Sequence, residues 1–226
     1  MLLLDESNRV LIDHLSELLF APSDVAVRNL RCENITDGVY MVGNTITDAL
    51  MWMLPKVQSV EVFHPYAVVT MHRAENMTFD TVAGVFDALD ILSHKMAIVF
   101  LAHPRLQSFV RDNKIPTHGI KLQQSVDYME LLTLVRSAEV ILTDSGGLQE
   151  ETCFLRVPCV TLRLSTERPE TIGIGANRLA LEPDEIVRAV QNASIVPRDW
   201  TYPYGDGTSA RKIAEIIERW GNDRHC

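Results

Sequence analysis

The segment TDSGGLQEET, residues 143–152, carries the residue types that could hold a phosphate. It follows the apolar run AEVIL, which is typical of a buried strand, and leads into a helix expected from Leu148. Amides at a helix N-terminus have no partner within the helix, so they bind anions. Ser145 adds a hydroxyl, and Gly146 and Gly147 allow a ligand to approach the backbone closely. A simple capped turn is the competing interpretation of these residues.

Two glutamates follow this segment within the same expected helix. Glu150 and Glu151 lie too far into the helix to serve as first-turn carboxylates that complement its dipole. A carboxylate one turn deeper can accept two hydrogen bonds from a vicinal diol, as an acidic residue does for ribose in dinucleotide sites. The alternative for either glutamate alone is a solvated helix face. The pattern therefore predicts amides for a phosphate and a glutamate for the sugar beside it.

The segment TMHRAEN places His72 directly after another apolar strand, with Arg73, Glu75 and Asn76 in the loop that follows. A lone histidine is usually structural, but here a cation for phosphate lies beside a carboxylate that can orient it. We expect His72 to donate a proton to a leaving diphosphate and Arg73 to bind phosphate.

Two further polar segments follow apolar strands. His103, in AHPR, is placed like His72, although capping the helix that begins with Pro104 is an alternative. Arg168, in STERPE, is expected either to bind phosphate or to form an ion pair with Glu167 or Glu170.

These segments need a scaffold that brings strand ends together. Short apolar strands alternate with amphipathic helices, which is typical of a parallel sheet covered on both faces. The strands are expected at 66–72, 97–103, 139–144 and 158–163, and the helices at 79–95, 105–113, 127–138 and 148–156. The sequence from about residue 48 to residue 200 therefore predicts a doubly wound α/β domain, with its ligand at the carboxyl ends of the strands.

The two ends of the chain carry further expected elements. A helix is expected from Glu6 to Leu19, because Val10, Leu11, Leu15, Leu18 and Leu19 recur at helical spacing. A short strand, a helix, a second strand and another helix follow at 19–23, 24–33, 39–44 and 45–55, and a last helix is expected at 209–220.

Composition limits the classes of function. The chain has 226 residues, 46% of them hydrophobic, and a formal net charge of -9, which argues against binding nucleic acid or an anionic membrane through broad electrostatics. We expect no membrane span, because no run of about 18 apolar residues occurs. The cysteines, Cys32, Cys153, Cys159 and Cys226, suggest neither a metal site nor a disulfide framework, so a cytoplasmic location is expected. P-loop, dinucleotide-fingerprint and serine-hydrolase motifs are also absent.

The segments HRAEN, AHP, TDSGGLQEE, ERPE and YPYGDG, in this order, resemble the non-hydrolysing UDP-N-acetylglucosamine 2-epimerases. In that family two Rossmann-like domains form a glycosyltransferase-B type fold with the active site in the cleft between them. The resemblance covers essentially the whole chain. It implies that residues 1–44 are a remnant of the N-terminal Rossmann-like domain, 45–205 the C-terminal UDP-binding domain and 206–226 a C-terminal helix.

The resemblance also implies roles for individual residues. Ser145, Gly146 and Gly147 would bind the diphosphate, and Glu151, rather than Glu150, would bind the ribose. His72 would take part in catalysis near the diphosphate. In bacterial members a second, activating UDP-GlcNAc molecule would lie near His103.

The implied reaction interconverts UDP-GlcNAc and UDP-ManNAc by anti elimination of UDP and its re-addition to 2-acetamidoglucal, a step toward cell-surface polysaccharides. It needs no cofactor or metal, and the family's members form dimers. The family usually has Pro-Glu-Glu where this chain has Leu4, Asp5 and Glu6, so Asp5 and Glu6 are the implied acidic groups for C2. Because the family's preceding strands and helices are absent here, we expect a truncated chain that binds UDP weakly and epimerises poorly alone.

Two other functions compete with this interpretation. One is a nucleotide-sugar-binding module or subunit without catalysis of its own, whose missing half comes from another polypeptide. The other is a glycosyltransferase of the glycosyltransferase-B type, which would transfer the sugar to an acceptor.

Overall fold

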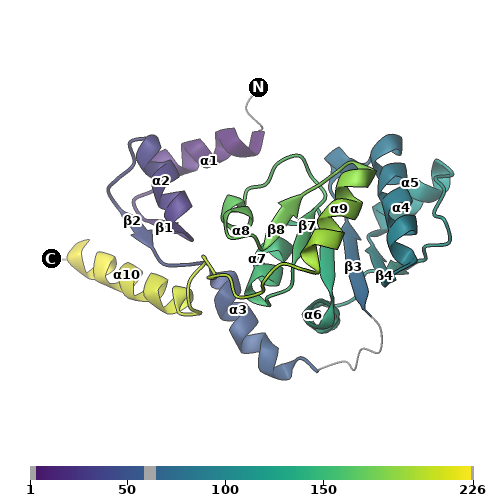
Figure 1. Ribbon diagram of the computed structural model, residues 1–226. Coiled ribbons are helices and arrows are strands. Elements are labelled where there is room, and N and C mark those ends of the chain that lie inside the picture. The colour runs from purple at the N-terminus through teal and green to yellow at the C-terminus, as the bar shows by residue number, and fades with distance from the viewer. Residues whose placement is uncertain (1–3, 59–64, 225–226) are drawn as a thin grey trace. The chain divides into compact units, whose positions relative to one another are not determined.

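The computed structural model describes residues 4–58 and 65–224, except for the side chains of Leu4, Asp5 and Arg224. The chain divides into two compact units, Met1–Trp52 with Pro203–Cys226, and Met53–Tyr202 (Figure 1). The first unit is therefore made from both ends of the chain, and the second is one continuous segment. The expected domain boundaries lay at residues 44/45 and 205/206.

The second unit is built on a parallel sheet of six strands in the order β5-β4-β3-β6-β7-β8. The strands are β3 (Tyr66–Met71), β4 (Ala97–Ala102), β5 (Leu122–Gln124), β6 (Val140–Thr143), β7 (Cys159–Thr161) and β8 (Asn177–Leu179). The central strand β3 pairs with β4 on one side and with β6 on the other, where Thr70 lies in register with Thr143. This order confirms the α/β class with a parallel, Rossmann-like sheet.

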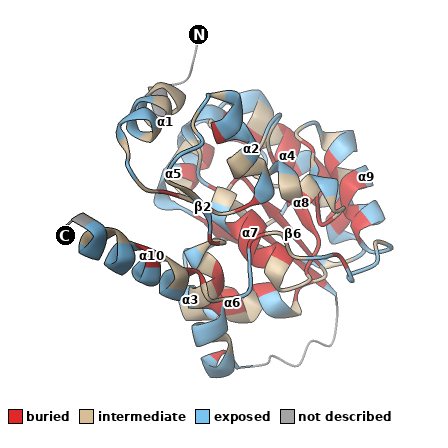
Figure 2. Cartoon of the chain, turned by 90° about the vertical axis from the view of Figure 1, so that its left-hand side faces the viewer, coloured by how far each residue is buried: buried red, intermediate tan, exposed pale blue. Residues whose placement is uncertain are grey.

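Helices cover both faces of this sheet. They are α4 (Phe79–Ser93), α5 (Pro104–Asp112), α6 (Tyr128–Ser137), α7 (Gly146–Phe154), α8 (Pro169–Gly173) and α9 (Pro183–Ala193), with a short 3-10 turn at Ala74–Asn76. Alternate residues of β3 serve the two faces, since successive side chains of a strand point in opposite directions. Ala67, Val69 and Met71 pack with α4, α5 and α9, whereas Tyr66 and Val68 pack with α6 and α7. Figure 2 shows the buried residues along these strands and the inner helix faces.

The first unit contains a two-stranded parallel sheet of β1 (Leu19–Ala21) and β2 (Val39–Met41). Its helices are α1 (Leu4–Leu15), α2 (Asp24–Cys32), α3 (Thr45–Met53) and α10 (Ser209–Arg224), and a 3-10 turn at Leu54–Lys56 follows α3. The helix expected to run to Leu19 was wrong at its C-terminal end, because Leu19 pairs with Val39 in the sheet.

The two chain segments of the first unit meet closely where α10 begins. The carboxylate of Asp48 on α3 accepts hydrogen bonds from the amides of Ser209 (3.2 Å) and Ala210 (2.9 Å), so α3 caps α10. Gly43 has φ +88°, and a Cβ there would lie 2.7 Å from Ser209 Oγ and 2.9 Å from the Tyr204 carbonyl oxygen. Glycine is therefore required at position 43 by both its backbone conformation and its surroundings.

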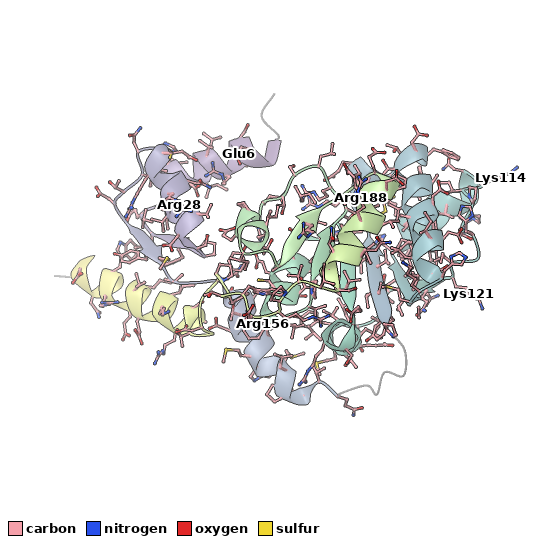
Figure 3. All side chains as sticks on the ribbon, viewed as in Figure 1. Glu6, Arg28, Lys114, Lys121, Arg156 and Arg188 are labelled. Atoms are coloured by element: carbon pink, nitrogen blue, oxygen red, sulfur yellow. The ribbon has the colours of Figure 1, made fainter. Side chains whose placement is uncertain are left out.

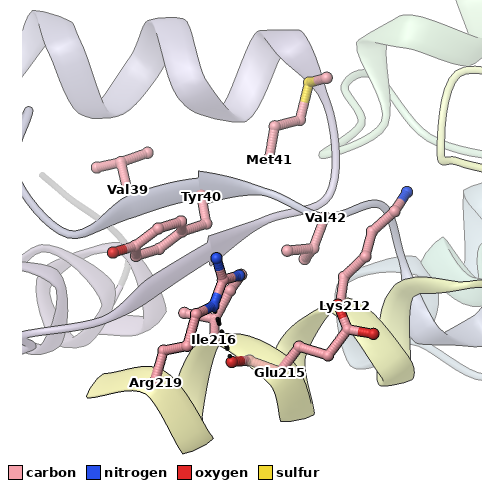
Figure 4. A pocket seen from close by; sticks show the side chains of 8 residues that line it. All are labelled: Val39, Tyr40, Met41, Val42, Lys212, Glu215, Ile216 and Arg219. Atoms are coloured by element: carbon pink, nitrogen blue, oxygen red, sulfur yellow. Dashed lines mark hydrogen bonds between the residues drawn. The ribbon is translucent and has the colours of Figure 1, made fainter. Parts of the chain in front are cut away.

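A pocket of about 320 Å³ also lies in the first unit, between β2 and α10 (Figure 4). Tyr40 and Met41 line it from the strand, and Lys212, Glu215 and Arg219 line it from the helix. The Arg219 Nε donates to the Glu215 carbonyl oxygen over 3.1 Å, which keeps this guanidinium on its own helix.

Within residues 4–58 and 65–224, no helix is both long and apolar enough to cross a lipid bilayer.

Candidate functional site

The centre of the candidate site is a hydrogen-bonded pair formed by His72 and Asp144, which follow the neighbouring strands β3 and β6. The Nδ1 of His72 lies 2.8 Å from Oδ1 of Asp144, whose side chain is fully buried. Oδ2 of Asp144 accepts from the amides of His72 (3.0 Å) and Arg73 (2.9 Å) and from Nδ2 of Asn76 (3.1 Å). One buried carboxylate thus fixes both the imidazole and the start of the loop that carries it.

The contact between His72 and Asp144 shifts the pKa of both side chains. The hydrogen bond to Asp144 raises the pKa of His72 above its ordinary value, against the opposing effect of burial. Burial acts to raise the pKa of Asp144, but the hydrogen bonds from His72 and from the amides outweigh it, and the pKa is lowered. Asp144 is therefore a carboxylate that stabilises an imidazolium, while Nε2 of His72 is left to donate to a ligand.

Helix α7 begins beside this pair. Ser145 is its N-cap, with Oγ accepting from the Leu148 amide over 3.4 Å, and its own amide donates to Oγ1 of Thr143. A Cβ at Gly147 would meet nothing within 4 Å, and one at Gly146 would only approach Glu167 and Arg168 at 3.9 and 4.0 Å. Neither glycine has a positive φ, so packing within the described structure does not require them. The first-turn amides of α7 have no partner within the helix, and the two glycines place no side chain beside them, which suits an anion site.

The two glutamates of α7 have separate partners. Both are buried, so the alternative of a solvated helix face was wrong. Glu150 pairs with Arg168, whose Nε donates to Oε1 of Glu150 and whose Nη1 donates to the Glu167 carbonyl oxygen over 3.0 Å. Arg168 therefore forms an ion pair with a residue of α7 and also lies near Gly146.

Glu151 contacts helix α6 instead. The hydroxyl of Tyr128 donates to its Oε1 over 3.0 Å. Burial raises the pKa of Glu151 to about 7, and the nearby Glu150 adds to this, although the Tyr128 hydrogen bond acts in the opposite direction. Near neutral pH this carboxyl group is therefore balanced between its two protonation states.

The buried side-chain amides of Gln149 and Asn177 position the loop that carries Arg168. Oε1 of Gln149, on α7, accepts from Oγ1 of Thr166 (2.6 Å) and from Nδ2 of Asn177 (3.1 Å). The Arg168 amide in turn donates to Thr166 Oγ1 over 3.0 Å. The position of this loop therefore follows from side chains of α7 and β8.

A group of arginines and glutamates lies beside the helix start. Arg163 forms two hydrogen bonds with Glu167, of 2.7 and 2.8 Å, and this arginine lowers the pKa of Glu167 to about 2. Arg73 lies 3.3 Å from Glu75 and 3.6 Å from Glu167. Arg73 and Arg163 are thus both held by glutamate carboxylates.

His72 and His103 line one pocket of about 240 Å³ at the ends of β3 and β4. Its other lining residues are mostly apolar or small: Thr70, Met71, Leu101, Ser125, Val126 and Leu131. His103 is also the N-cap of α5, with Nδ1 accepting from the Arg105 amide over 3.2 Å. The structure thus brings the two histidines together and gives His103 the capping role as well.

Asp5 and Glu6 belong to the first unit, on α1. Glu6 is labelled in Figure 3, and it forms an ion pair of 2.6 Å with Arg9, which also binds Asp13 and Glu33. The Arg9 hydrogen bond lowers the pKa of Glu6. The side chain of Asp5 lies outside the described part of the chain.

Sequence reasoning missed Asp144, Tyr128 and Arg163 as members of the site. The signal for Asp144 was present, because it directly follows a strand as His72 does, but its role depends on β3 and β6 being neighbours. Tyr128 had no such signal, since its partner lies 23 residues away on another helix. Among the described residues, no three His, Cys, Asp or Glu side chains gather in a way that could hold a metal ion.

Comparison with known proteins gives consistent matches. The family model described as UDP-N-acetylglucosamine 2-epimerase matches residues 2–218. A UDP-N-acetylglucosamine 2-epimerase of Methanocaldococcus jannaschii is 40% identical, over 94% of this chain and 64% of that protein. The chain therefore spans a little under two thirds of the length of this relative.

Solved structures agree with the sequence matches. The crystal structure of Methanocaldococcus jannaschii UDP-GlcNAc 2-epimerase in complex with UDP-GlcNAc and UDP superposes with a TM-score of 0.86 at 38% identity, covering 95% of this chain and 64% of that one. The S. aureus MnaA structure with UDP gives a TM-score of 0.86 at 26% identity, covering 97% of this chain and 65% of that one.

Proposed function

The chain belongs to the UDP-N-acetylglucosamine 2-epimerase family, and on this premise we propose that it binds UDP-GlcNAc and acts in its epimerisation to UDP-ManNAc. The second unit supplies the UDP half of the site. The observation that carries this proposal is the His72–Asp144 pair beside the open N-terminus of α7.

The diphosphate is placed by the start of α7. The amides of Gly146 and Gly147 and the Ser145 hydroxyl donate to its oxygens, and Arg73 and Arg168 supply positive charge. Glu151 accepts from the ribose hydroxyls of the same ligand.

The chemical step breaks the C1–O bond of the sugar and removes the proton from C2. The C2–H electron pair forms the C1=C2 double bond, and the C1–O electron pair leaves with UDP. His72, whose pKa is raised by the hydrogen bond to Asp144, donates a proton through Nε2 to the departing diphosphate and so stabilises the leaving group. Re-addition of UDP reverses these events, with the proton returned to the other face of C2.

The removal of the C2 proton requires a base. Asp5 and Glu6 are the groups that the family resemblance implies, and Glu6 forms two hydrogen bonds with Arg9. His103, on the pocket it shares with His72, is proposed to contact a second UDP-GlcNAc molecule. We also propose a cytoplasmic location and a homodimer, as the family resemblance implies.

The test is a calorimetric titration of the chain with UDP, with ADP and inorganic phosphate as controls, followed by incubation with UDP-GlcNAc in deuterated water. We expect saturable binding that prefers UDP, weaker binding by His72→Gln and Glu151→Ala, and deuterium at C2 of the product UDP-ManNAc. Equal binding of UDP and ADP, or unchanged binding by both variants, would contradict the proposed UDP site.

A second function is favoured by one observation, namely that every contact of the UDP site described above lies within the second unit. A chain with this site alone could serve as a nucleotide-sugar-binding subunit. That function would be supported if the chain bound UDP but incorporated no deuterium. Deuterium incorporation should then appear when the N-terminal domain of a complete relative is added.

A further inference from the structure

Tyr128 is a tyrosine of the candidate site that the reaction described above does not use. It is the first residue of α6, and its hydroxyl donates to Oε1 of Glu151 on α7 over 3.0 Å. The Glu151 side chain is buried at 6% exposure, whereas Tyr128 is 36% exposed. The tyrosine therefore lies at the border between solvent and a carboxylate that solvent barely reaches.

A carboxylate that receives two hydroxyl groups of a ribose needs a fixed plane. Free rotation of the Glu151 carboxyl group would cost entropy when the diol binds, and the hydrogen bond from Tyr128 removes part of that freedom in advance. The hydrogen bond uses one acceptor position of Oε1 and leaves Oε2 and the remaining lone pairs for a ligand.

We propose that Tyr128 is a positioning residue that holds the carboxyl group of Glu151 in the orientation needed to recognise the ribose 2′- and 3′-hydroxyls. This inference rests on the proposed function, because it assumes that Glu151 faces the ribose of UDP. It assigns to α6 a share in discriminating ribonucleotides from deoxyribonucleotides.

The charges around Glu151 make the ionised form sensitive to this hydrogen bond. Burial and the neighbouring Glu150 both favour the neutral acid, and Tyr128 opposes them from α6. Glu150 is itself paired with Arg168 from the loop before α8. Removal of the Tyr128 hydroxyl takes away the interaction that favours the carboxylate, so the pKa of Glu151 rises further.

The experiment compares the affinities of the whole chain for UDP and 2′-deoxy-UDP between pH 6 and pH 9. We expect the wild-type chain to prefer UDP. We expect Tyr128→Phe to reduce this preference about fivefold at pH 7, and the pH at which the preference is half complete to move upward. Tyr66→Phe is the matched control, because the Tyr66 hydroxyl donates to the Leu134 carbonyl oxygen of the same helix over 2.6 Å.

The outcomes separate this inference from the proposed function. A Tyr128→Phe chain with the wild-type preference and pH dependence, alongside a Glu151→Gln chain that has lost the preference, would overturn the role of Tyr128 alone. A wild-type chain that binds UDP and 2′-deoxy-UDP equally would remove the role of Glu151 and with it that of Tyr128. A wild-type chain that binds neither nucleotide would overturn the proposed function as well.

Discussion

Asp144 accepts hydrogen bonds from both the backbone amide and the imidazole of His72, with Nδ1 at 2.8 Å from Oδ1. The same carboxylate therefore holds both the backbone and the ring of His72, and its hydrogen bond raises the pKa of the imidazole. A histidine held in this way loses little freedom on meeting a ligand.

Asp144→Asn is expected to weaken UDP binding about tenfold at pH 7 and to lower the free energy of unfolding by about 3 kcal/mol. The amide group of asparagine would face N–H donors that the carboxylate now satisfies.

The His72–Asp144 pair also makes stability depend on pH. Because the pKa of His72 is raised above 6.5 in the folded state, the stabilising contribution of His72 is complete below pH 6.5 and is lost as the pH rises through the folded value.

An NMR titration of the His72 ring measures this pKa, which should fall in Asp144→Asn. Asp87→Asn is the control, because Asp87 forms a similar 2.9 Å contact with His118 at an exposed place. If both variants bound UDP like the wild-type chain, the assigned role of the His72–Asp144 pair would be wrong.

Gly147→Ala is expected to keep or slightly raise the stability of the chain, by up to about 1 kcal/mol, because alanine favours a helix and a Cβ at 147 meets nothing. It is expected to weaken UDP binding about tenfold, because the added methyl group would hinder the close approach of a diphosphate to the first-turn amides. Thermal unfolding and calorimetry measure the two effects. Gly221→Ala, which is equally open and lies in α10, should raise stability without changing UDP affinity.

Glu151→Gln is expected to change how stability depends on pH. The pKa of Glu151 rises from 4.5 to about 7 on folding, so its contribution is complete below pH 4.5 and is lost as the pH rises through about 7. Each pKa unit corresponds to about 1.4 kcal/mol, so the wild-type chain loses roughly 3 kcal/mol over this range.

Denaturant unfolding at pH 5 and pH 8 measures the Glu151 contribution. The loss should disappear in Glu151→Gln and persist in Glu130→Gln, which alters an exposed glutamate of α6. An identical loss in both variants would mean that other groups cause it.

Arg168→Ala is expected to lower the free energy of unfolding by about 3 kcal/mol, because it leaves the buried Glu150 charge without its arginine. The double variant Glu150→Gln with Arg168→Met should regain most of that loss. If Arg168 also contacts the diphosphate, the double variant will be stable and will still bind UDP more weakly. Wild-type affinity for UDP in the double variant would mean that Arg168 forms the ion pair with Glu150 but does not contact the diphosphate.

Gly43→Ala and Gly119→Ala form a matched pair of substitutions at positive φ. Gly119 has φ +83° and nothing within 4 Å of an added Cβ. Gly119→Ala should therefore lower the free energy of unfolding only by the backbone strain of about 1 kcal/mol. Gly43→Ala adds contacts of 2.7 and 2.9 Å to Ser209 and Tyr204, so it should cost several times more. Equal unfolding temperatures for the two variants would contradict the close approach of position 43 to Ser209 and Tyr204.

The sequence predicted the strands β3, β4, β6 and β7, because continuous apolar runs of this length are typical of the buried strands of a parallel sheet. The edge strands β5 and β8 consist of three residues each, LQQ and NRL, and their sequences carry no strand pattern. Helix α9 does have a signal, since Ile186, Ala189, Val190 and Ala193 follow helical spacing, but it is not among the predicted helices.

The candidate site was predictable only as separate segments. His72 and the D-S-G-G turn could each be chosen for chemistry, but their connection through Asp144 spans 72 residues and depends on strand order. The burial of Glu150 and Glu151 was hidden for a similar reason, because the partners Arg168 and Tyr128 come from distant segments.

The division of the chain also sets an order of events during synthesis. Residues 203–226 belong with residues 1–52, and Asp48 caps a helix whose first amide lies 161 residues further along the chain. On the ribosome, the early part of the first unit must wait for its last helix, while the segment 53–202 can complete its own core. The second unit is therefore expected to fold before the first unit is complete, because its residues form one continuous segment of the chain.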